Sequence, residues 1–471
     1  MQPWHSGVRM RVRTRPIQLF AATLFACSSA GLAQGADGRP KSFLADPGTT
    51  FVLENVRLID GTGAPAQEQL TIVIDNGRIA AFGKDRVATP AGAKRINLSG
   101  HTVLPGLVMM HEHINYFSGA YVWDAQPGTV PKLLLAAGVT TARTAGGEAP
   151  QVDLNLKKRI DAGAAPGPRL FVTGAYLNGS SGGFLGDTVV SSAAEGREVT
   201  AYWGARGATS MKAYSAISPE ALRGAAEEAN RRGMHVAGHL GEISCTQAAE
   251  VGIHTIEHTL TSCAKDLAVT PDAMATFRYD PSSAMAKRLI ALLVAKGVAM
   301  VSTPTTTEPY DGTEEELSML SPDQLRRYEA NVKTPPPWLP PRAAMVSWDA
   351  AHRAFERDFV TAGGRLLIGG DASDFGVVPG YANHRAMIAL VRGGFSPLQV
   401  IKFATSDAAA FLKQDDLGTI AKGKIADLLV VKGAPDRHIE DIRNVAYVFK
   451  EGVAYDPAKL RASSKGMLGL H

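Results

Sequence analysis

Cysteine and net charge are both scarce in this sequence, and each scarcity excludes a class of protein. The 471 residues include three cysteines, of which two, Cys245 and Cys263, lie beyond the first 33 residues. Two cysteines are too few for a disulfide framework, although a single bridge between them is permitted in an oxidising compartment. Four arginines between residues 9 and 15 account for the whole formal charge of +4. The neutral remainder gives no indication of nucleic acid or an anionic membrane surface as a partner.

A long apolar run is also lacking at the N-terminus. The run IQLFAATLFAC, residues 17–27, is well short of the roughly 18 residues that a transmembrane helix needs. Because it follows a basic stretch and precedes small residues, it predicts an export signal over residues 1–33, with cleavage before Gln34. Met10 is an alternative start. The expected location is periplasmic or secreted, with a lipid anchor on Cys27 as the rival interpretation.

The rest of the chain reads as a soluble globular protein, because 45% of its residues are hydrophobic and 20% are charged. Two segments, 50–104 and 417–457, consist of short apolar runs separated by glycine-rich turns. Asn-Gly at 76–77, between two apolar runs, predicts a β-hairpin. Because the two segments flank everything between them, we expect them to pair into one small β-sandwich domain.

Between these segments, residues 105–416 alternate apolar strands with helical stretches. A strand ending in His111 comes first, and seven more follow at 138–144, 169–177, 208–215, 234–242, 252–260, 297–305 and 365–373. A helix is clearest at 218–233, where Ser218 is a good N-cap, Pro219 suits the first turn and Gly233 suits the end. Eight strands separated by helices predict an α/β fold, a (β/α)8 TIM barrel, with its active site at the carboxyl ends of the strands.

Two histidines stand one residue apart at the end of the first barrel strand, in VLPGLVMMHEH (residues 103–113). Side chains two residues apart in a strand point to the same face, so His111 and His113 lie together. Neutral imidazole is the commonest metal ligand in proteins. A buried, hydrogen-bonded core residue is the alternative for either histidine alone. The pair predicts a metal site if other strands supply further ligands.

Polar side chains stand near the C-terminal ends of four further strands. They are Lys212 in SMKAY, His239 in AGHLGE, His258 in TIEHTL and Asp371 in IGGDAS. Each alone has a structural explanation, as a surface lysine, a core histidine or an aspartate at a helix N-cap. Together they obey one rule, because all these strand ends face the mouth of the barrel. A lysine is almost never buried without a partner, so its position among histidines needs a chemical reason.

These motifs resemble the amidohydrolase superfamily, and within it the chain is similar to imidazolonepropionase-like and Xaa-Pro dipeptidase-like metal-dependent hydrolases. The likeness runs from about residue 50 to residue 456 and includes the closing GTIAKGKIADLLVV. The resemblance implies two divalent metal ions, usually zinc, and six ligands: His111, His113, Lys212, His239, His258 and Asp371. The histidine pair and Asp371 would hold one metal, and His239 and His258 the other. Lys212 would bridge them as an N-carboxylated lysine.

The resemblance also implies a reaction. A hydroxide bridging metals about 3.5–4 Å apart would attack a carbonyl, and Asp371 would act as the general base that passes its proton to the leaving amine. We expect an exported hydrolase of an amide bond in a small molecule, either a dipeptide or an N-acyl amino acid. Hydrolysis of a cyclic amide, a lactone or a xenobiotic amide on the same centre is the alternative. The complete ligand set argues against a non-enzymatic binding protein. The sequence leaves open whether the protein forms a homo-oligomer.

Two further residues are candidates for substrate binding. Tyr214 lies two residues after Lys212 and therefore on the same face, where it could bind a substrate carboxylate or the developing oxyanion. Its alternative is a barrel-core tyrosine. Arg143 ends the second strand and could pair with a substrate carboxylate, with a structural ion pair as its alternative.

Two loops bear on the choice of substrate. After the third strand the sequence reads SSGGF (180–184), where many relatives have a histidine after the paired glycines, and this departure leaves the substrate class open. Residues 306–345 form a long irregular insertion on the active-site side of the barrel, and such loops are usually functional or disordered. Trp338 and the apolar LSML at 317–320 predict a lid over an apolar group of the substrate.

Overall fold

The computed structural model describes residues 40–84, 87–119, 122–180, 186–269, 276–336, 339–374 and 376–470. The predicted export signal, Cys27 and Trp338 lie outside the described residues, as does most of the SSGGF loop.

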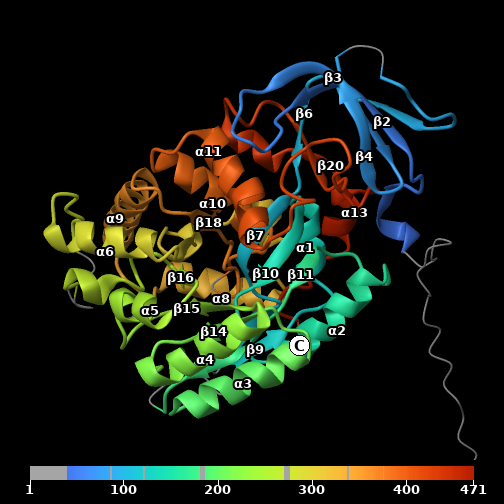
Figure 1. The fold of residues 1–471 in the computed structure, drawn as a ribbon. Coiled ribbons are helices and arrows are strands. Elements are labelled where there is room, and N and C mark those ends of the chain that lie inside the picture. Colours follow the sequence, from blue (N-terminus) through green and yellow to red (C-terminus); the bar gives the residue numbers. More distant parts are fainter. Residues whose placement is uncertain are drawn as a thin grey trace, which may run out of the picture.

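Parallel strands make up the centre of the molecule (Figure 1). In chain order they are β7 (Leu107–Glu112), β10 (Val139–Thr144), β11 (Arg169–Phe171), β12 (Thr173–Asn178), β13 (Thr188–Val189), β14 (Ser210–Ala213), β15 (His235–Gly238), β16 (Thr255–Glu257), β17 (Ala299–Ser302) and β18 (Leu366–Ile368). Every residue of β7, β10 and β14 is buried, which suits strands covered on both faces.

These strands form two hydrogen-bonded sheets, with orders β11-β10-β7 and β13-β12-β14-β15-β16-β17-β18. The sheets adjoin at both of their ends. β11 leads into β12 after the single residue Val172. At the other end, the backbone N–H of Asp371, beyond β18, donates to the carbonyl of His111 in β7 at 3.0 Å. The structure therefore has the TIM-barrel-like α/β fold that the alternating pattern predicts.

Helices cover the outside of these strands. They are α1 (Val130–Ala136), α2 (Pro150–Asp161), α3 (Ala193–Ala205), α4 (Pro219–Arg232), α5 (Cys245–Val251), α6 (Ala284–Ala295), α9 (Arg342–Thr361), α10 (Tyr381–Arg392), α11 (Pro397–Lys402) and α12 (Ala408–Phe411). The helix predicted at 218–233 is confirmed as α4: the Ser218 side chain accepts from the backbone of Ala221, and Gly233 closes the helix at a φ of 68°. Proline at the first turn and glycine after the last therefore mark its ends.

A nine-stranded sheet joins the two ends of the chain on one side of the molecule (Figure 1). Its strands are β1 (Leu44–Asp46), β2 (Phe51–Leu58), β3 (Gln67–Asp75), β4 (Arg78–Gly83), β5 (Lys94–Asn97), β6 (His101–Pro105), β19 (Leu428–Lys432), β20 (Val445–Lys450) and β21 (Val453–Tyr455). The N- and C-terminal segments meet where β6 pairs antiparallel with β19. Phe51 and Phe449, one from each segment, pack in the core of this sheet. Its description as a two-layered sandwich, and the predicted domain boundaries, stay predictions.

The Asn-Gly hairpin is confirmed between β3 and β4, which pair antiparallel. Asn76 and Gly77 both have positive φ, at 47° and 79°. A two-residue turn with positive φ at both positions matches the right-handed twist of the flanking strands, and this is why asparagine and glycine are preferred there.

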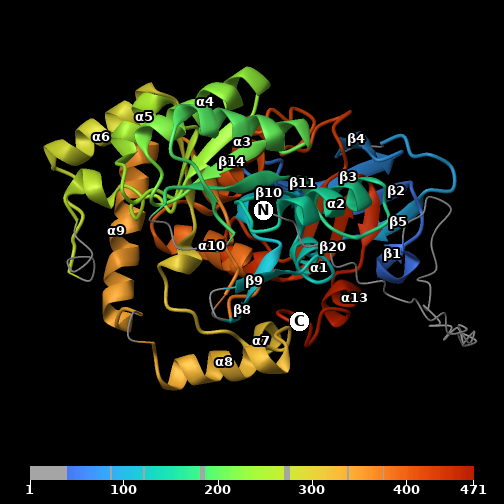
Figure 2. The same cartoon turned by 90° about the horizontal axis from the view of Figure 1, so that it is seen from below.

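The segment 306–345 is not irregular throughout, because it contains α7 (Glu314–Leu317) and α8 (Pro322–Lys333). Thr313 and Ser321 cap these helices with side-chain hydrogen bonds to backbone N–H groups. LSML does not act as the predicted lid. Met319 and Leu320 are buried against the C-terminal tail, where the carbonyl of Met319 accepts from the backbone of Leu468. Figure 2 shows α7 near α13 (Pro457–Ala462), and Arg461 of α13 pairs with Glu315 of α7 at 3.3 Å.

Cys245 and Cys263 form a disulfide, which links the start of α5 to the segment after β16. The alternative left open by the sequence is thus decided in favour of a bridge. Among the helices in the described part of the chain, none is both long and apolar enough to span a membrane.

Candidate active site

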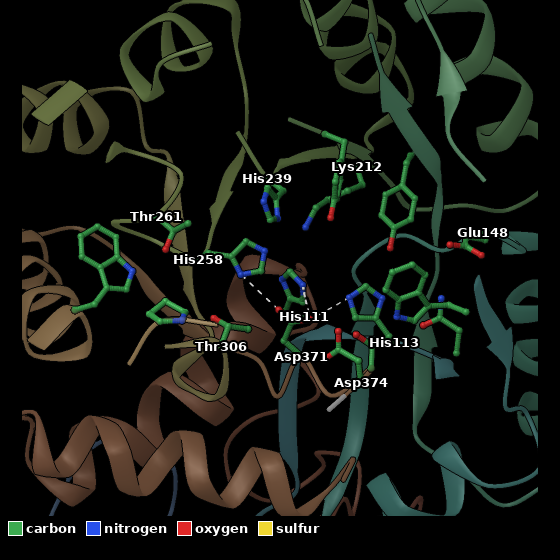
Figure 3. Close-up of a pocket in the computed structure, with 17 residues that line it drawn as sticks. His111, His113, Glu148, Lys212, His239, His258, Thr261, Thr306, Asp371 and Asp374 are labelled. Atoms are coloured by element: carbon green, nitrogen blue, oxygen red, sulfur yellow. Dashed lines mark ion pairs between the residues drawn. The ribbon is translucent and has the colours of Figure 1, made fainter. Parts of the chain in front are cut away.

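A cavity of about 390 Å³ lies at the carboxyl ends of the parallel strands (Figure 3). All six residues predicted as metal ligands line it: His111, His113, Lys212, His239, His258 and Asp371. They come from β7, β14 and the residues that follow β7, β15, β16 and β18. Strand ends that are far apart in the sequence therefore converge on one site, as the barrel topology predicts.

The first group of potential ligands is His111, His113 and Asp371. Asp371 Oδ1 lies 3.4 Å from His111 Nε2 and 3.1 Å from His113 Nε2. One potential ligand atom from each of the three residues lies within 4.8 Å of the other two. Burial alone would raise the pKa of Asp371, but the neighbouring histidines, chiefly His111, hold it well below its usual value. The group thus offers two imidazole nitrogens and an ionised carboxylate to a cation.

A buried carboxylate orients His111. Glu257 Oε2 lies 2.5 Å from His111 Nδ1, so that nitrogen is the donor. With a metal ion bound, the neutral ring would present the lone pair of Nε2 to the cavity. Glu257 Oε1 in turn accepts from Thr255 Oγ1 at 2.7 Å. A hydrogen bond of this kind to the far nitrogen of a metal-binding histidine fixes its tautomer and raises its basicity. No motif in the sequence distinguished Glu257 from the ligands beside it.

The role predicted for Arg143 in holding a substrate carboxylate is wrong. Its side chain is 1% exposed and does not line the cavity. Its guanidinium donates to Glu257 Oε1 at 2.7 Å, to Thr255 Oγ1 at 3.2 Å and to the carbonyl of Met110 at 2.8 Å. Arg143 is the counter-ion of a buried carboxylate, which is the alternative that the sequence left open.

The second group is His239 and His258, whose ring centroids are 4.5 Å apart. Burial, together with the charge of Lys212, lowers the pKa of His239 to about 3. Burial and the neighbouring His239 lower the pKa of His258 well below its usual value. Both imidazoles are therefore neutral at physiological pH, which is the form that binds metal ions.

Backbone strain is concentrated at two of these positions. His258 and Asp371 have φ values of 58° and 46°, in the left-handed region that non-glycine residues seldom adopt. Such conformations cost of order 1–3 kcal/mol each and are typical of functional sites. His258 is held there by its contacts: its Nδ1 lies 2.8 Å from Thr303 Oγ1 and 3.4 Å from Asp371 Oδ2.

Lys212 is buried without an ion-pair or hydrogen-bonding partner among the described residues, which is rare for a lysine. It is 1% exposed, and among the described residues its amine makes no hydrogen bond or ion pair. Burial lowers its pKa to about 8, against the charges of Glu257 and Asp371. More of the amine is therefore unprotonated near neutral pH than in an exposed lysine, and this fraction is available as a nucleophile or a ligand.

A comparison with protein families decides the assignment. The model of the Amidohydrolase family matches residues 102–454. The chain belongs to this family. It is a hydrolase acting on carbon–nitrogen bonds, in a family whose members generally depend on metal ions, and its residues include a group able to hold one.

Individual relatives are distant. The dihydroorotase of Pelobacter propionicus is 26% identical over 420 residues, which are 81% of this chain and 89% of that protein. A Xaa-Pro dipeptidase with methionine bound in its active site has a TM-score of 0.67 at 23% identity, covering 86% of this chain and 100% of that one. Bottromycin amidohydrolase also has a TM-score of 0.67, at 22% identity, covering 91% and 92%. At these identities the structural likeness shows the fold.

The cavity of this amidohydrolase also has walls to which the sequence did not point. Tyr214 lines it as predicted, with its ring stacked on His239 at 4.7 Å between centroids. The remaining lining residues are Asn115, Trp123, Glu148, Tyr176, Thr261, Thr306, Pro340, Trp348, Ser373 and Asp374. For Asn115 a signal existed, because it follows His113 by two residues. Thr306 and Pro340 belong to the segment 306–345, which the sequence placed on the active-site side. Trp123 and Tyr176 lie in β9 (Val122–Ala125) and β12, and the rest come from loops and from α9.

Proposed function

We propose that this amidohydrolase cleaves the amide bond of a dipeptide or an N-acyl amino acid at a binuclear zinc centre. A donor set of nitrogen and oxygen without thiolate suits zinc. One observation carries the proposal: a buried lysine without an ion-pair partner among the described residues lies between two groups of neutral or anionic ligands around one cavity. His111, His113 and Asp371 would hold one ion, and His239 and His258 the other.

Lys212 would connect the two groups as a carbamate. Its neutral Nζ attacks carbon dioxide, forms a nitrogen–carbon bond and releases one proton, which leaves an anionic carboxylate at the end of the side chain. The lowered pKa of Lys212, caused chiefly by burial, favours the neutral amine that this step needs. The carbamate would offer two anionic oxygens to the metal ions, whereas an ammonium would repel them.

Bound at these residues, two divalent ions supply a hydroxide nucleophile at neutral pH and polarise the scissile carbonyl. Asp371 performs the proton transfer in this proposal. Its ionised carboxylate faces the cavity between His113 and His258, takes a proton on one oxygen and returns it to the leaving amine. Tyr214 contributes a hydroxyl to the same wall.

A second candidate function is the opening of a cyclic amide or a related ring on the same centre. The relatives named dihydroorotase favour it. A structural neighbour described as a Xaa-Pro dipeptidase favours the linear amide. A substrate carboxylate decides between them, because the proposed dipeptide or N-acyl amino acid carries one beyond the scissile bond, within reach of Tyr214.

Chelation is expected to abolish activity, and added zinc or manganese is expected to restore it. Fully active enzyme should contain close to two metal ions per chain, measured by elemental analysis after exhaustive dialysis. About one ion per chain in fully active enzyme would contradict the binuclear centre.

An N-acyl amino acid is expected to be a better substrate than its C-terminal amide. A charge-assisted hydrogen bond is worth roughly 1.5–3 kcal/mol, or about ten- to over a hundredfold in kcat/KM. The two compounds differ only in the carboxylate, so the comparison needs no variant. Equal hydrolysis of acid and amide would instead favour the cyclic amide or lactone.

We also propose that the protein is exported to the periplasm or secreted. The arginine-rich start and short apolar run support this, and a disulfide between Cys245 and Cys263 suits an oxidising compartment. N-terminal sequencing of the exported protein should find a start near Gln34. A start at Met1 or Met10 in that fraction would refute export by this signal, and a lipid on Cys27 would establish the anchored form.

A further inference from the structure

One wall of the active-site cavity consists of hydrogen-bond acceptors. We infer that this amidohydrolase selects amide substrates that carry a cationic amine, which lies against Asn115, Glu148 and Asp374. The inference rests on the proposed function and names the substrate class that the same cavity accepts. Figure 3 shows Glu148 and Asp374 on the His113 side of the site, away from Thr261.

Asn115 provides an acceptor without a partner. It begins β8 (Asn115–Gly119), is 9% exposed and lines the cavity. Its Oδ1 is buried and accepts no hydrogen bond from the described residues. A buried acceptor left unpaired is unfavourable, so a group that donates a hydrogen bond at this point gains from pairing with it.

Asp374 adds a carboxylate on the same side. It lines the cavity, and within the described part of the chain its carboxyl forms no ion pair or hydrogen bond. Burial raises its pKa well above the usual value, and the charge of Asp371 adds to this. An ammonium group beside Asp374 would supply the counter-charge that the protein does not provide there.

Glu148 is the second carboxylate of this wall. It accepts a hydrogen bond from the backbone of Trp123, and burial together with acidic neighbours raises its pKa. Gly186 gives it room, because a Cβ at that position would lie 2.5 Å from the Cγ of Glu148. Within the described residues the side chain is thus seated at the cavity with a single backbone donor, which leaves acceptor capacity for a ligand.

Apart from the proposed metal ions, the described part of the cavity offers little positive charge to this wall. Lys212 is the only lysine or arginine that lines the cavity among the described residues. The undescribed residues within the barrel segment, at 120–121, 181–185, 270–275, 337–338 and 375, include no lysine or arginine in their sequence. Arg143, which the sequence suggested as a partner for a substrate carboxylate, forms its ion pair with Glu257 instead. An ammonium placed against the wall would meet these acceptors without competition from an arginine or from a lysine other than Lys212.

Aromatic side chains strengthen the preference for a cation. Trp123 and Tyr176 line the cavity on the side of Glu148. The face of an aromatic ring attracts an ammonium group through its quadrupole. The cavity therefore combines carboxylates, an unpaired amide oxygen and ring faces, which is a set of groups that recognises an amine.

The experiment compares lysine with norleucine, which differ in the terminal ammonium alone. Metal-loaded enzyme is given the dipeptide of two norleucines, and the dipeptides in which lysine replaces the first or the second residue. A fourth substrate, with the α-amino group of the norleucine dipeptide acetylated, tests the α-ammonium. We expect kcat/KM to favour the cationic member of at least one matched pair by tenfold or more, because a charge-assisted hydrogen bond replaces contact with an apolar group.

Variants assign the preference to the wall. Glu148→Gln and Asp374→Asn should each reduce the ratio of cationic to neutral kcat/KM. Glu220→Gln, at an exposed glutamate in the first turn of α4, should leave the ratio unchanged. The inference is overturned if no cationic member is preferred, or if a preference persists in both wall variants.

Binding separates this inference from the proposed function. Calorimetry with the amides of lysine and norleucine measures the charge preference without turnover. If no dipeptide is hydrolysed but the lysine amide binds at least tenfold more tightly, the proposed reaction fails and the amine site stands. If dipeptides are hydrolysed without preference and both amides bind equally, the reaction stands and the amine site fails.

Discussion

Asp371→Asn is expected to lower kcat by roughly 10²-fold or more while the protein keeps its fold, because the variant loses general acid–base catalysis. The amide and the carboxylate are nearly the same size, and Asp371 Oδ1 lies at hydrogen-bonding distance from His113 Nε2. The amide cannot take up a proton at neutral pH. Its loss of charge also removes an anionic ligand from the first metal group. Steady-state kinetics at saturating substrate, with metal content measured on the same sample, test this expectation.

A surface aspartate provides the control. Asp416 forms an exposed ion pair with Arg78 outside the cavity, so Asp416→Asn should retain normal turnover. Near-normal kcat in Asp371→Asn with both metals bound would assign the proton transfer to another group. Loss of one metal together with activity would identify Asp371 as a ligand without testing its role as a base.

Lys212→Ala is expected to reduce activity by more than roughly 100-fold, beyond the loss that is typical when a residue behind a metal ligand is removed. Short-chain carboxylic acids such as acetate or propionate should restore part of that activity, because a free carboxylate can enter the space left by the side chain and bridge the two groups. The dependence of activity on acid concentration, followed in metal-loaded variant, is the measurement. The absence of any rescue would argue against a carboxylate at this position.

The matched control uses another buried lysine. Lys450 in β20 has a side chain that is 6% exposed but lies outside the cavity, next to Glu451. Added carboxylic acids should leave the activity of Lys450→Ala unchanged. A crystal structure with both metals bound and an unmodified ammonium at Lys212 would refute carboxylation outright.

The sequence was sufficient for features governed by local rules. The ends of α4 follow from Ser218 and Gly233, because capping depends on neighbouring residues alone. The convergence of Lys212 and Asp371 at one mouth follows from strand order, because all parallel strands of such a barrel end on the same face. For this reason the residues proposed as ligands could be picked out before any contact between them was known.

The sequence failed where a side chain finds its partner across the fold. Arg143 and Glu257 are 114 residues apart in the sequence and meet only in the folded barrel. No local pattern therefore revealed that the guanidinium already has a carboxylate partner. LSML has the composition of a lid, yet it is buried against Leu468 in a tail that no periodicity connects to it.

The sequence by itself thus determined the family, the TIM-barrel-like fold and the residue types at the strand ends, since these depend on short patterns and on topology. Only the tertiary structure decided what stands around those strand ends. Asn115, Glu148 and Asp374 line one cavity although they come from β8 and from loops after β10 and β18. Their significance lies in the scarcity of lysine and arginine side chains around them, which depends on every side chain that reaches the cavity and is therefore a property of the packed molecule and not of any segment.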